Sequence, residues 1–309
     1  MTNSPVWLNS VGVASGTVID NVFDALDKRQ IYMRVYDETA GKYLNPGTFA
    51  KFDYADESTA WAVVETTTNT WSFDMSSTQF DRGNKYKLEI YGKDKAGNQH
   101  ESGCPWGPSS VSGDCQTGSS IGAKYIRYFR YDKAAPGIVI EVPVITNPNN
   151  IGGISALNTI SGTSAESEPG VEAGVSTITY VLKYGNNYWT GSAWQLSGAE
   201  IRGTAGGTVA NWTISGVNWQ KSQNYTLTVR AIDAAGNTSD QSMTFNYDTD
   251  APESKVTTTG GAYVNARISA ISGTVGDQLY SSTCTSSGLD ISSFSIKIER
   301  LSDSYTWNG

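Results

Sequence analysis

The chain has 309 residues, with 22 lysines and arginines against 30 aspartates and glutamates, which gives a net charge of −8. This acidity argues against binding to nucleic acid or to an anionic membrane surface, because both carry negative charge. No apolar run reaches membrane-spanning length, so no membrane insertion is expected, and no secretion signal is visible at the amino terminus.

Short β-strands fill the first part of the chain. In the segments WSF and YKLEI, the apolar residues Trp71, Phe73, Tyr86 and Leu88 alternate with polar ones, which is the period of a half-buried strand. Turns rich in glycine, asparagine and serine recur roughly every 8–12 residues, and no amphipathic run of helix length interrupts them. The pattern predicts an all-β protein built from antiparallel sandwiches.

A cysteine pair marks an insertion near residues 99–123. Cys104 and Cys115 bracket the segment CPWGPSSVSGDC. A metal site would need shorter spacing and more ligands, so we predict a local disulfide, which indicates an oxidising compartment. Two reduced surface thiols are the alternative, and Trp106 inside the loop is a candidate contact for a glycan or a protein. Cys284 is left over, and the sequence does not identify its partner.

The middle of the chain repeats the motifs of the first part. The segments YKLEIYGKDKAGN and YTLTVRAIDAAGN correspond, and each copy ends in an Ala-Pro linker, at Pro136 and Pro252. A Gly-Thr signature in ASGTVID, ISGTSAE and ISGTVGD marks the first strand of each of three units. We therefore predict two complete domains, 1–136 and 137–252, and the first half of a third domain over 253–309.

A tryptophan hairpin belongs to the second unit. Tyr188, Trp189 and Trp194 surround a tight turn at Gly191, and the motif YTWNG repeats it in the third unit. A residue type that recurs with the fold is expected to cover the core. The alternative is a contact with a ligand, because exposed aromatic rings can stack on sugars.

The order of these motifs resembles a known family. GT, YW-G-x-W, D-x-AGN and D-T-x-AP follow one another as in the bacterial immunoglobulin-like (Big-type) repeats of large extracellular surface and adhesin-like proteins. The resemblance implies tandem immunoglobulin-like antiparallel β-sandwiches arranged end to end, in an extracellular or cell-surface protein without catalytic residues. Tyr86 and Tyr225 stand where such sandwiches have a tyrosine corner, whose hydroxyl bonds to nearby backbone.

These features predict a non-catalytic structural or adhesive segment, such as the stalk or fibre of a large bacterial surface protein. With one histidine, His100, the chain lacks the histidine-based nucleophile and multi-histidine zinc motifs of many enzymes. Its expected partners are neighbouring repeats of the same chain. Two alternatives stay open: a module that binds a cell-surface glycan or protein, and a subunit that assembles with its own copies into a filament or coat.

Acidic residues at the domain junctions predict a Ca²⁺ cofactor. Counting strands from the Gly-Thr signature places Asp20 and the exit residue Asp132 beside Asp233 and Asn237 of the next unit. The same count groups the matching turn and linker of the second unit at the next junction, namely Glu166, Asp248 and Asp250. Ca²⁺ takes carboxylate and amide oxygens as ligands, and without a cation such carboxylates repel one another. The alternative is that each aspartate caps its own turn.

Overall fold

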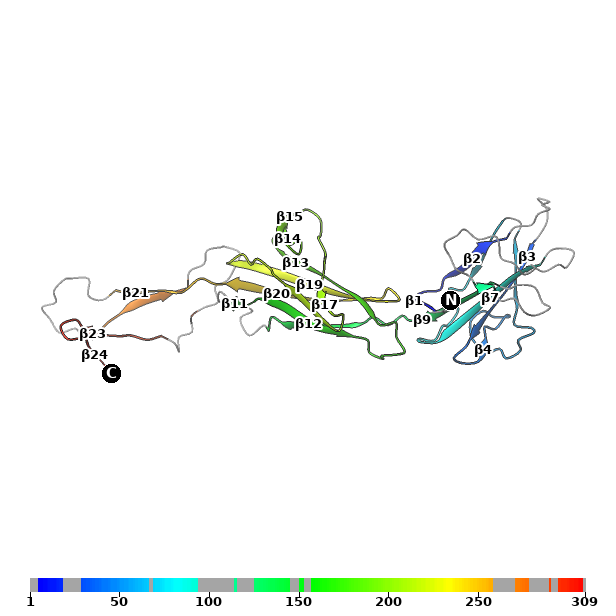
Figure 1. Cartoon of the computed structure of the whole chain (residues 1–309), viewed down its shortest axis with the longest axis horizontal. Coiled ribbons are helices and arrows are strands. Elements are labelled where there is room, and N and C mark those ends of the chain that lie inside the picture. Colours follow the sequence, from blue (N-terminus) through cyan, green and yellow to red (C-terminus); the bar gives the residue numbers. More distant parts are fainter. Residues whose placement is uncertain are drawn as a thin grey trace. The chain divides into compact units, whose positions relative to one another are not determined.

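β-Strands and turns make up the described part of the chain (Figure 1). The computed structural model describes residues 5–18, 29–66, 69–93, 114–115, 125–144, 150–152, 157–257, 270–277, 289 and 294–307. These ranges contain no helix, which confirms the predicted all-β class. It follows that nothing in them forms a helix long and apolar enough to cross a membrane.

The first repeat forms two sheets. Its strands are β1 (Val6–Leu8), β2 (Val13–Thr17), β3 (Arg29–Asp37), β4 (Lys42–Tyr43), β5 (Ala62–Thr66), β6 (Thr70–Asp74), β7 (Lys85–Lys93), β8 (Asp114–Cys115) and β9 (Tyr125–Tyr131). The larger sheet has the order β1-β9-β7-β3-β4, with β5 paired to β3 and β8 paired to β9, and the smaller sheet pairs β2 with β6. β1 runs parallel to β9, whereas the long neighbours β9, β7 and β3 are antiparallel.

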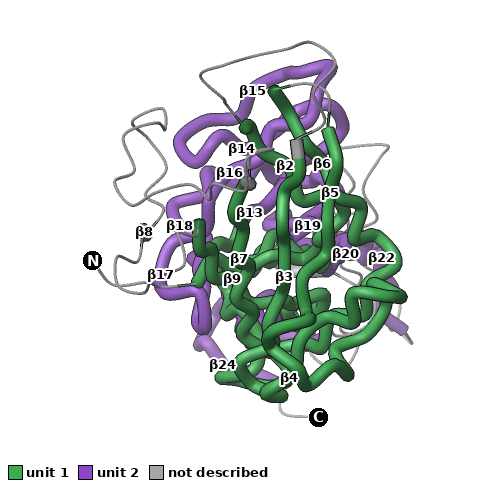
Figure 2. The backbone as a smooth tube through the Cα atoms, turned by 90° about the vertical axis from the view of Figure 1, so that its right-hand side faces the viewer, with its two compact units in different colours: residues 1–138, 164–178, 230–240 green, residues 139–163, 179–229, 241–309 purple. Residues whose placement is uncertain are grey.

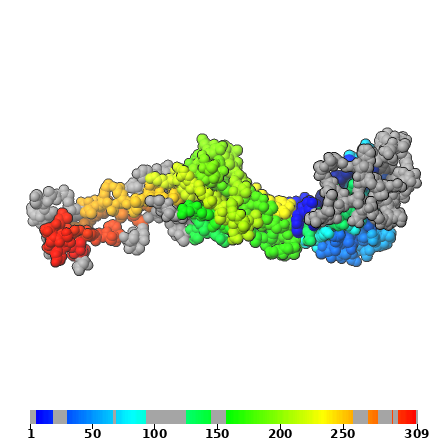
Figure 3. All heavy atoms as spheres, viewed as in Figure 1, coloured from blue at the N-terminus to red at the C-terminus, as the bar shows by residue number. Residues whose placement is uncertain are grey.

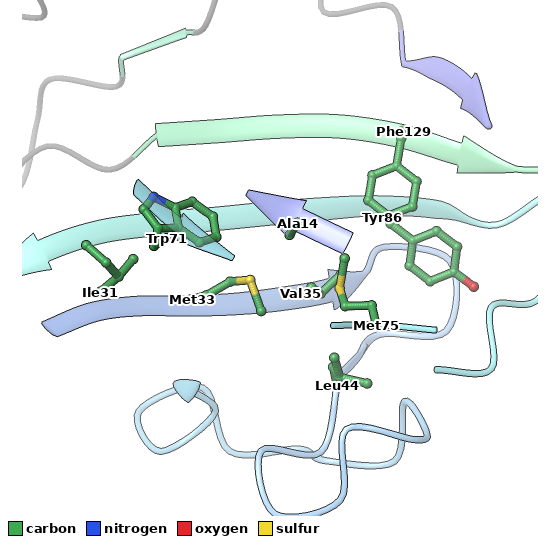
Figure 4. Packing of buried hydrophobic residues seen from close by; sticks show 9 residues of the cluster. All are labelled: Ala14, Ile31, Met33, Val35, Leu44, Trp71, Met75, Tyr86 and Phe129. Carbon is green, nitrogen blue, oxygen red and sulfur yellow. The ribbon is translucent and has the colours of Figure 1, made fainter. Parts of the chain in front are cut away.

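The core of the first repeat lies between these two sheets. Alternating residues on each strand point to one face, so the apolar set of one sheet meets that of the other. The buried cluster drawn in Figure 4 consists of Ala14, Ile31, Met33, Val35, Leu44, Trp71, Met75, Tyr86 and Phe129. Tyr86 and Phe129 lie side by side there, with ring centroids 5.3 Å apart. A sandwich core shared by both sheets is what the period-two pattern predicted.

The second repeat has the same layout with longer strands. Its strands are β10 (Gly137–Val142), β11 (Asn150–Gly152), β12 (Thr159–Ala165), β13 (Val175–Tyr184), β14 (Asn187–Trp189), β15 (Trp194–Leu196), β16 (Gly203–Thr204), β17 (Gly206–Gly207), β18 (Asn211–Ser215), β19 (Gln223–Asp233) and β20 (Thr238–Asp248). One sheet has the order β10-β12-β18-β17, and the other β11-β20-β19-β13-β14-β15, with β16 paired to β13. β11 runs parallel to β20, as β1 does to β9.

Two compact units divide the chain (Figure 2). One holds residues 1–138, 164–178 and 230–240, and the other holds residues 139–163, 179–229 and 241–309. The first unit therefore contains the linker after β9 together with the nearest loops of the second repeat. The domain boundaries at Pro136 and Pro252 stay a prediction.

The Gly-Thr signature leaves room for a tryptophan on the neighbouring strand. Gly16 of β2 pairs with Trp71 of β6, and a Cβ on Gly16 would lie 2.8 Å from the Trp71 Nε1 atom. Gly162 of β12 pairs with Trp212 of β18, where a Cβ would overlap the Trp212 ring and the Val139 carbonyl oxygen. The recurring glycine is thus a packing requirement of the sandwich.

Strand β10 was not predicted from the sequence. This strand changes the end of the sandwich at which β12 finishes. β10 starts directly after Pro136, and a Cβ on Gly137 would lie 3.3 Å from the Ala165 carbonyl oxygen at the end of β12. β12 therefore ends where β10 begins, beside the linker. The sequence count took the Gly-Thr strand as the first strand and placed its end at the far end of the sandwich, and that placement is wrong.

Both predicted tyrosine corners are confirmed. The Tyr86 hydroxyl accepts a hydrogen bond from the Asp81 N–H at 2.7 Å and donates to the Asp81 carbonyl oxygen at 3.3 Å. The Tyr225 hydroxyl makes the same pair of bonds with the backbone of Gln220, at 2.7 and 2.8 Å. Each corner satisfies a buried hydroxyl and two backbone groups at the start of a central strand.

Tyr225→Phe is expected to lower the free energy of unfolding by about 1–2 kcal/mol, because it leaves the Gln220 N–H and carbonyl without their partner. Urea denaturation of the full chain, followed by tryptophan fluorescence, measures the loss. Tyr188→Phe is the matched control, since Tyr188 is half-buried on the hairpin and its hydroxyl is not part of a corner. Equal losses in the two variants would show that the corner has no special weight.

The C-terminal segment, orange to red in Figure 3, exposes positions that the second repeat buries. Its strands are β21 (Glu253–Val256), β22 (Gly273–Gly276), β23 (Glu299–Arg300) and β24 (Tyr305–Thr306). The β23–β24 hairpin pairs Glu299 with Thr306 as the β13–β14 hairpin pairs Lys183 with Tyr188. In this alignment Phe294, Ile296 and Ile298, exposed by 59, 56 and 39%, match Ile178, Tyr180 and Leu182, exposed by 3, 3 and 0%.

Residues 253–309 alone are expected not to melt cooperatively, whereas residues 137–252 alone should. The described residues of this segment include no counterpart of β19 and β20, which are next in order to β13 in its sheet, so strand edges stay unpaired and apolar side chains stay exposed. Thermal melts by circular dichroism and the dispersion of amide NMR signals measure the difference. A cooperative melt of isolated 253–309 would show that the third unit is aligned wrongly.

Candidate functional site

The linker after the first repeat is fastened to the loops of the second repeat through Asp132. This residue is fully buried. One carboxylate oxygen, Oδ1, accepts the Ala134 N–H at 2.9 Å, and the other, Oδ2, accepts the Ala173 N–H at 2.6 Å. Its own N–H donates to the Leu8 carbonyl oxygen at 2.9 Å. Asp132 thereby joins β1, the linker and the loop between β12 and β13.

The AGN turn between β19 and β20 meets the same linker. Within the turn, Asp233 Oδ1 accepts the Asn237 N–H and Asp233 Oδ2 accepts the Asn237 side-chain amide, both at 2.8 Å. The Asn237 amide also donates to the Asp132 carbonyl oxygen at 3.0 Å. The predicted meeting of Asp132, Asp233 and Asn237 is therefore present in the structure. Asp132 and Asp233 each cap their own turn as well, which is the alternative that the sequence left open, and the Ca²⁺ cofactor stays a prediction.

Glu166 has a buried carboxyl group without a hydrogen-bond partner, close to Asp132 and Asp233. Neither of its carboxyl oxygens is exposed to solvent or accepts a hydrogen bond. Burial, followed by the negative charges of Asp233, Glu172 and Asp132, raises the pKa of Glu166 to about 7. A carboxyl group with this pKa is about half protonated near pH 7, and a neighbouring cation would favour its ionised form.

Glu172 and Arg82 complete the cluster, and the sequence analysis missed both. The buried Glu172 carboxylate accepts the Ser167 hydroxyl at 2.8 Å and the Glu168 N–H at 3.0 Å. Burial opposes its ionisation, but these hydrogen bonds and the Arg82 charge together lower the pKa of Glu172 below its usual value. Arg82 lies 3.0 Å from Glu172 and 2.7 Å from Glu168. One sequence signal could have identified Arg82. It lies in the DRGNK corner of the first repeat, at the place that Lys221 takes in the QKSQN corner of the second.

The grouping of Glu166 with Asp248 and Asp250 is wrong. Glu166 lies near Asp132 and Asp233, beside the turn that precedes β20, whereas Asp248 ends that strand. The uncounted strand β10 causes this error. Asp250 is instead bound by Lys221 Nζ and by the Ser222 hydroxyl, each at 2.7 Å, so a lysine already balances its charge.

The donors near the linker have the chemistry that Ca²⁺ selects, but they are not arranged as a closed metal site. They are carboxylate and amide oxygens, with four carboxyl groups against one arginine. In the described ranges, no three histidine, cysteine or acidic side chains are grouped as metal ligands are. The orphaned oxygens of Glu166 are the feature that fits an added cation.

Several predicted site residues lie outside the described residues, namely Asp20, Cys104, Trp106 and Cys284. Cys115 is described only as part of the backbone of β8, which pairs with β9 through Cys115 and Tyr125. The disulfide between Cys104 and Cys115 therefore stays a prediction.

The tryptophan hairpin packs onto the core of the second repeat. Trp189 is 1% exposed, so its ring has almost no surface to offer a ligand. Trp194 lies with its ring centroid 4.8 Å from that of Tyr184 and 5.5 Å from that of Tyr225, and its Nε1 donates to the Asn218 carbonyl oxygen at 2.5 Å. Tyr188 is half-buried beneath Lys183 Nζ, 5.8 Å from its ring centroid. A ligand role for this hairpin stays a prediction that rests on Tyr188 and Trp194.

Comparison with known sequences finds a family match in the second repeat. The matched segment includes the tyrosine corner, the AGN turn and the exit linker. Residues 217–253 match the model of the bacterial Ig-like domain (group 3). This segment holds β19, β20 and Pro252, so the resemblance to bacterial immunoglobulin-like repeats is confirmed where its motifs lie. No curated protein matches the sequence.

Three solved structures show a partial likeness to this chain. A 1.5-MDa bacterial ice-binding adhesin is 14% identical over 80% of this chain and 63% of its own, with a TM-score of 0.29. Chicken CNTN1 FN1–FN3 domains are 11% identical over 78 and 65%, with a TM-score of 0.34. A tetra-tandem repeat from the extending region of a large adhesion protein is 17% identical over 88 and 56%, with a TM-score of 0.27. The chain thus spans less than two thirds of each, and the likeness concerns the fold alone.

Proposed function

We propose that this chain is a non-catalytic, extracellular, adhesin-type repeat segment whose role is to hold neighbouring domains at a fixed spacing. The family match supports the bacterial Ig-like part of this proposal. The contact that carries the mechanical part is Asp132, which binds both the β12–β13 loop and, through its carbonyl oxygen, the AGN turn. A linker fastened at both sides resists bending more than a flexible one.

The proposal includes Ca²⁺ as a cofactor at this junction, and the chemistry of the oxygen donors supports it. Glu166 would provide the free carboxylate oxygens, and Asp132, Asp233 and Asn237 have further oxygen atoms beside it. A divalent cation would balance the carboxylates that Arg82 leaves unpaired. The proposal does not extend to Asp248 and Asp250, because Lys221 already binds Asp250 and Glu166 lies with Asp132 and Asp233. A Ca²⁺ contact at Asp20 stays a prediction.

Excess Ca²⁺ is expected to raise the melting temperature of the full chain by about 3–8 °C over its value in chelator, because the ion binds the folded junction alone. Small-angle scattering should give a longer maximum dimension in Ca²⁺. Glu166→Gln, which keeps the side-chain volume, should abolish both effects, and Asp132→Ala should do the same. Glu200→Gln is the control, since Glu200 is exposed and paired with Arg202.

Identical melting and scattering curves in Ca²⁺ and chelator would leave these aspartates as ordinary turn formers. The junction would then depend on Arg82 and on packing alone. Here Gly83, at a φ of 81°, already lies so close to Val171 that a Cβ would meet its Cγ1 at 2.5 Å.

A further inference from the structure

The outer edge of strand β2 has no neighbouring strand among the described residues. β2 pairs with β6 alone, and the two form a sheet of two strands. Val18 donates its N–H to the Asn69 carbonyl oxygen, on the β6 side. Because backbone N–H groups alternate from one edge of a strand to the other, those of Ser15 and Thr17 face away from β6. We name this row of backbone groups the open edge.

Both other copies of the Gly-Thr strand have a neighbour at this edge. β12 lies between β18 and β10, and β22 pairs with β21. A Cβ on Gly162 would overlap the Val139 carbonyl oxygen of β10. One on Gly273 would overlap the Lys255 carbonyl oxygen of β21. At Gly16 the three atoms nearest to such a Cβ all belong to the tryptophan of β6, so no backbone lies on that side of the glycine in the described residues.

The strand that fills this place follows the same kind of linker each time. β10 begins at Gly137 and β21 begins at Glu253, both directly after an Ala-Pro pair. Their registers also agree. A Cβ on Gly137 would lie 3.3 Å from the Ala165 carbonyl oxygen, and Glu253 pairs with Gly276, each three residues beyond the signature glycine. The neighbour of a Gly-Thr strand is therefore an extended, antiparallel segment that leaves an Ala-Pro linker.

The first repeat is less covered where this neighbour is missing. The three positions of β2 that alternate with the core are exposed, whereas the matching three of β12 are half-buried. Ala14 and Trp71, on the core side, are 8 and 7% exposed. Their counterparts in the second repeat, Ile160 and Trp212, are 0 and 1% exposed. An edge with unpaired N–H and carbonyl groups is a template for a further strand.

We propose that the open edge binds a strand of the β10 kind, donated by another immunoglobulin-like repeat. The donor carries apolar side chains at alternate positions, as β10 does with the half-buried Ile138 and Ile140. Backbone hydrogen bonds supply the affinity of such strand addition. Thr17 takes the place of Thr163, which donates to the Glu141 carboxylate of β10 at 3.2 Å. The neighbours of β12 and β22 are both of this kind, which favours such a repeat over an unrelated partner.

A fluorescein-labelled peptide of residues 134–142 tests the proposal, with fluorescence anisotropy on the full chain. Two proline peptides supply the contrast. In β10 the Ile140 N–H donates to the Gln241 side chain at 2.6 Å, so it faces away from β12, and the Val139 N–H faces β12. Val139→Pro in the peptide should therefore weaken binding about tenfold, and Ile140→Pro should change it less than about threefold. Absence of binding up to about 0.5 mM chain, or equal binding of both proline peptides, overturns the proposal.

Ser15→Pro in the chain locates the site. It removes one N–H of the open edge and leaves the pairing of β2 with β6 in place. Ser72→Pro is the matched control, because Ser72 stands opposite Ser15 on β6 and its N–H faces the other edge of the same sheet. Ser15→Pro should weaken peptide binding about tenfold, and Ser72→Pro should leave it unchanged. An equal loss in the two variants overturns the assignment to β2.

Amide hydrogen exchange on the unchanged chain gives a test that needs no variant. The peptide should slow exchange at Ser15 and Thr17, whereas Val18, already bonded to β6, should exchange slowly with and without it. Protection elsewhere but not at Ser15 and Thr17 overturns the proposal. Dimers of the unchanged chain that Ser15→Pro abolishes, without peptide binding, would overturn it in favour of a second copy. The outcome does not depend on whether the repeats act as a spacer.

Discussion

Gly162→Ala is expected to lower the free energy of unfolding by about 3 kcal/mol, a large loss for the removal of one hydrogen and the addition of one methyl group. The new Cβ would overlap the Val139 carbonyl oxygen on one side and the Trp212 ring on the other. The carbonyl belongs to the neighbouring strand β10, so it cannot swing away as a flexible side chain could. Overpacking against such fixed groups costs roughly 1–3 kcal/mol and at times more.

Gly198→Ala is the control for this substitution. A Cβ on Gly198 would have nothing within 4 Å, and the residue lies in an exposed turn of the second repeat. Its stability should stay within about 0.5 kcal/mol of the unchanged chain. Chemical denaturation followed by tryptophan fluorescence measures both variants. If Gly162→Ala unfolds at the same denaturant concentration as Gly198→Ala, the signature glycine has another purpose.

In chelator, the stability of the chain is expected to fall by about 3 kcal/mol as the pH rises from 4.5 to 8, because of Glu166. Burial raises the pKa of Glu166 to about 7 from an ordinary value of 4.5. Between these values the folded chain holds a proton that the unfolded chain has released, so the stabilisation is complete below pH 4.5 and is lost through pH 7.

Glu166→Gln should remove this pH dependence, since its amide stays neutral throughout, and the variant should be the more stable protein at pH 8. Thermal melts at several pH values in chelator provide the measurement. Glu168→Gln serves for comparison, because Glu168 is exposed and paired with Arg82. A slope that survives in Glu166→Gln would mean that other groups cause it.

Much of the fold could be predicted because it depends on local patterns. Alternation in YTLTVRA gives the buried side of β19, and the tyrosine corners follow from a polar turn before Tyr86 and Tyr225. β10 was missed because GIVIEV follows a linker and carries no Gly-Thr signature. One uncounted strand then moved Glu166 from one end of the sandwich to the other.

The candidate site was predicted only in part, since it combines residues that are distant in the sequence. Asp132, Asp233 and Asn237 could be found because each belongs to a repeated motif. Arg82 belongs to a corner that both repeats share, but Glu172 belongs to a loop without a shared motif, and their pairing depends on how these two loops meet. Pairing between distant strands likewise decides that Arg34 lies opposite Glu89, and no local pattern reports it.

The parallel pairing of β1 with β9 has a mechanical consequence. Val6, Trp7 and Leu8 pair with Phe129, Arg130 and Tyr131. A chain under tension pulls β1 from its amino end and β9 from its carboxyl end, in opposite directions along the same pair. The load therefore shears all of their hydrogen bonds together, whereas it would open an antiparallel hairpin one bond at a time. β11 and β20 form the matching parallel pair in the second repeat, where the load reaches β10 before β11.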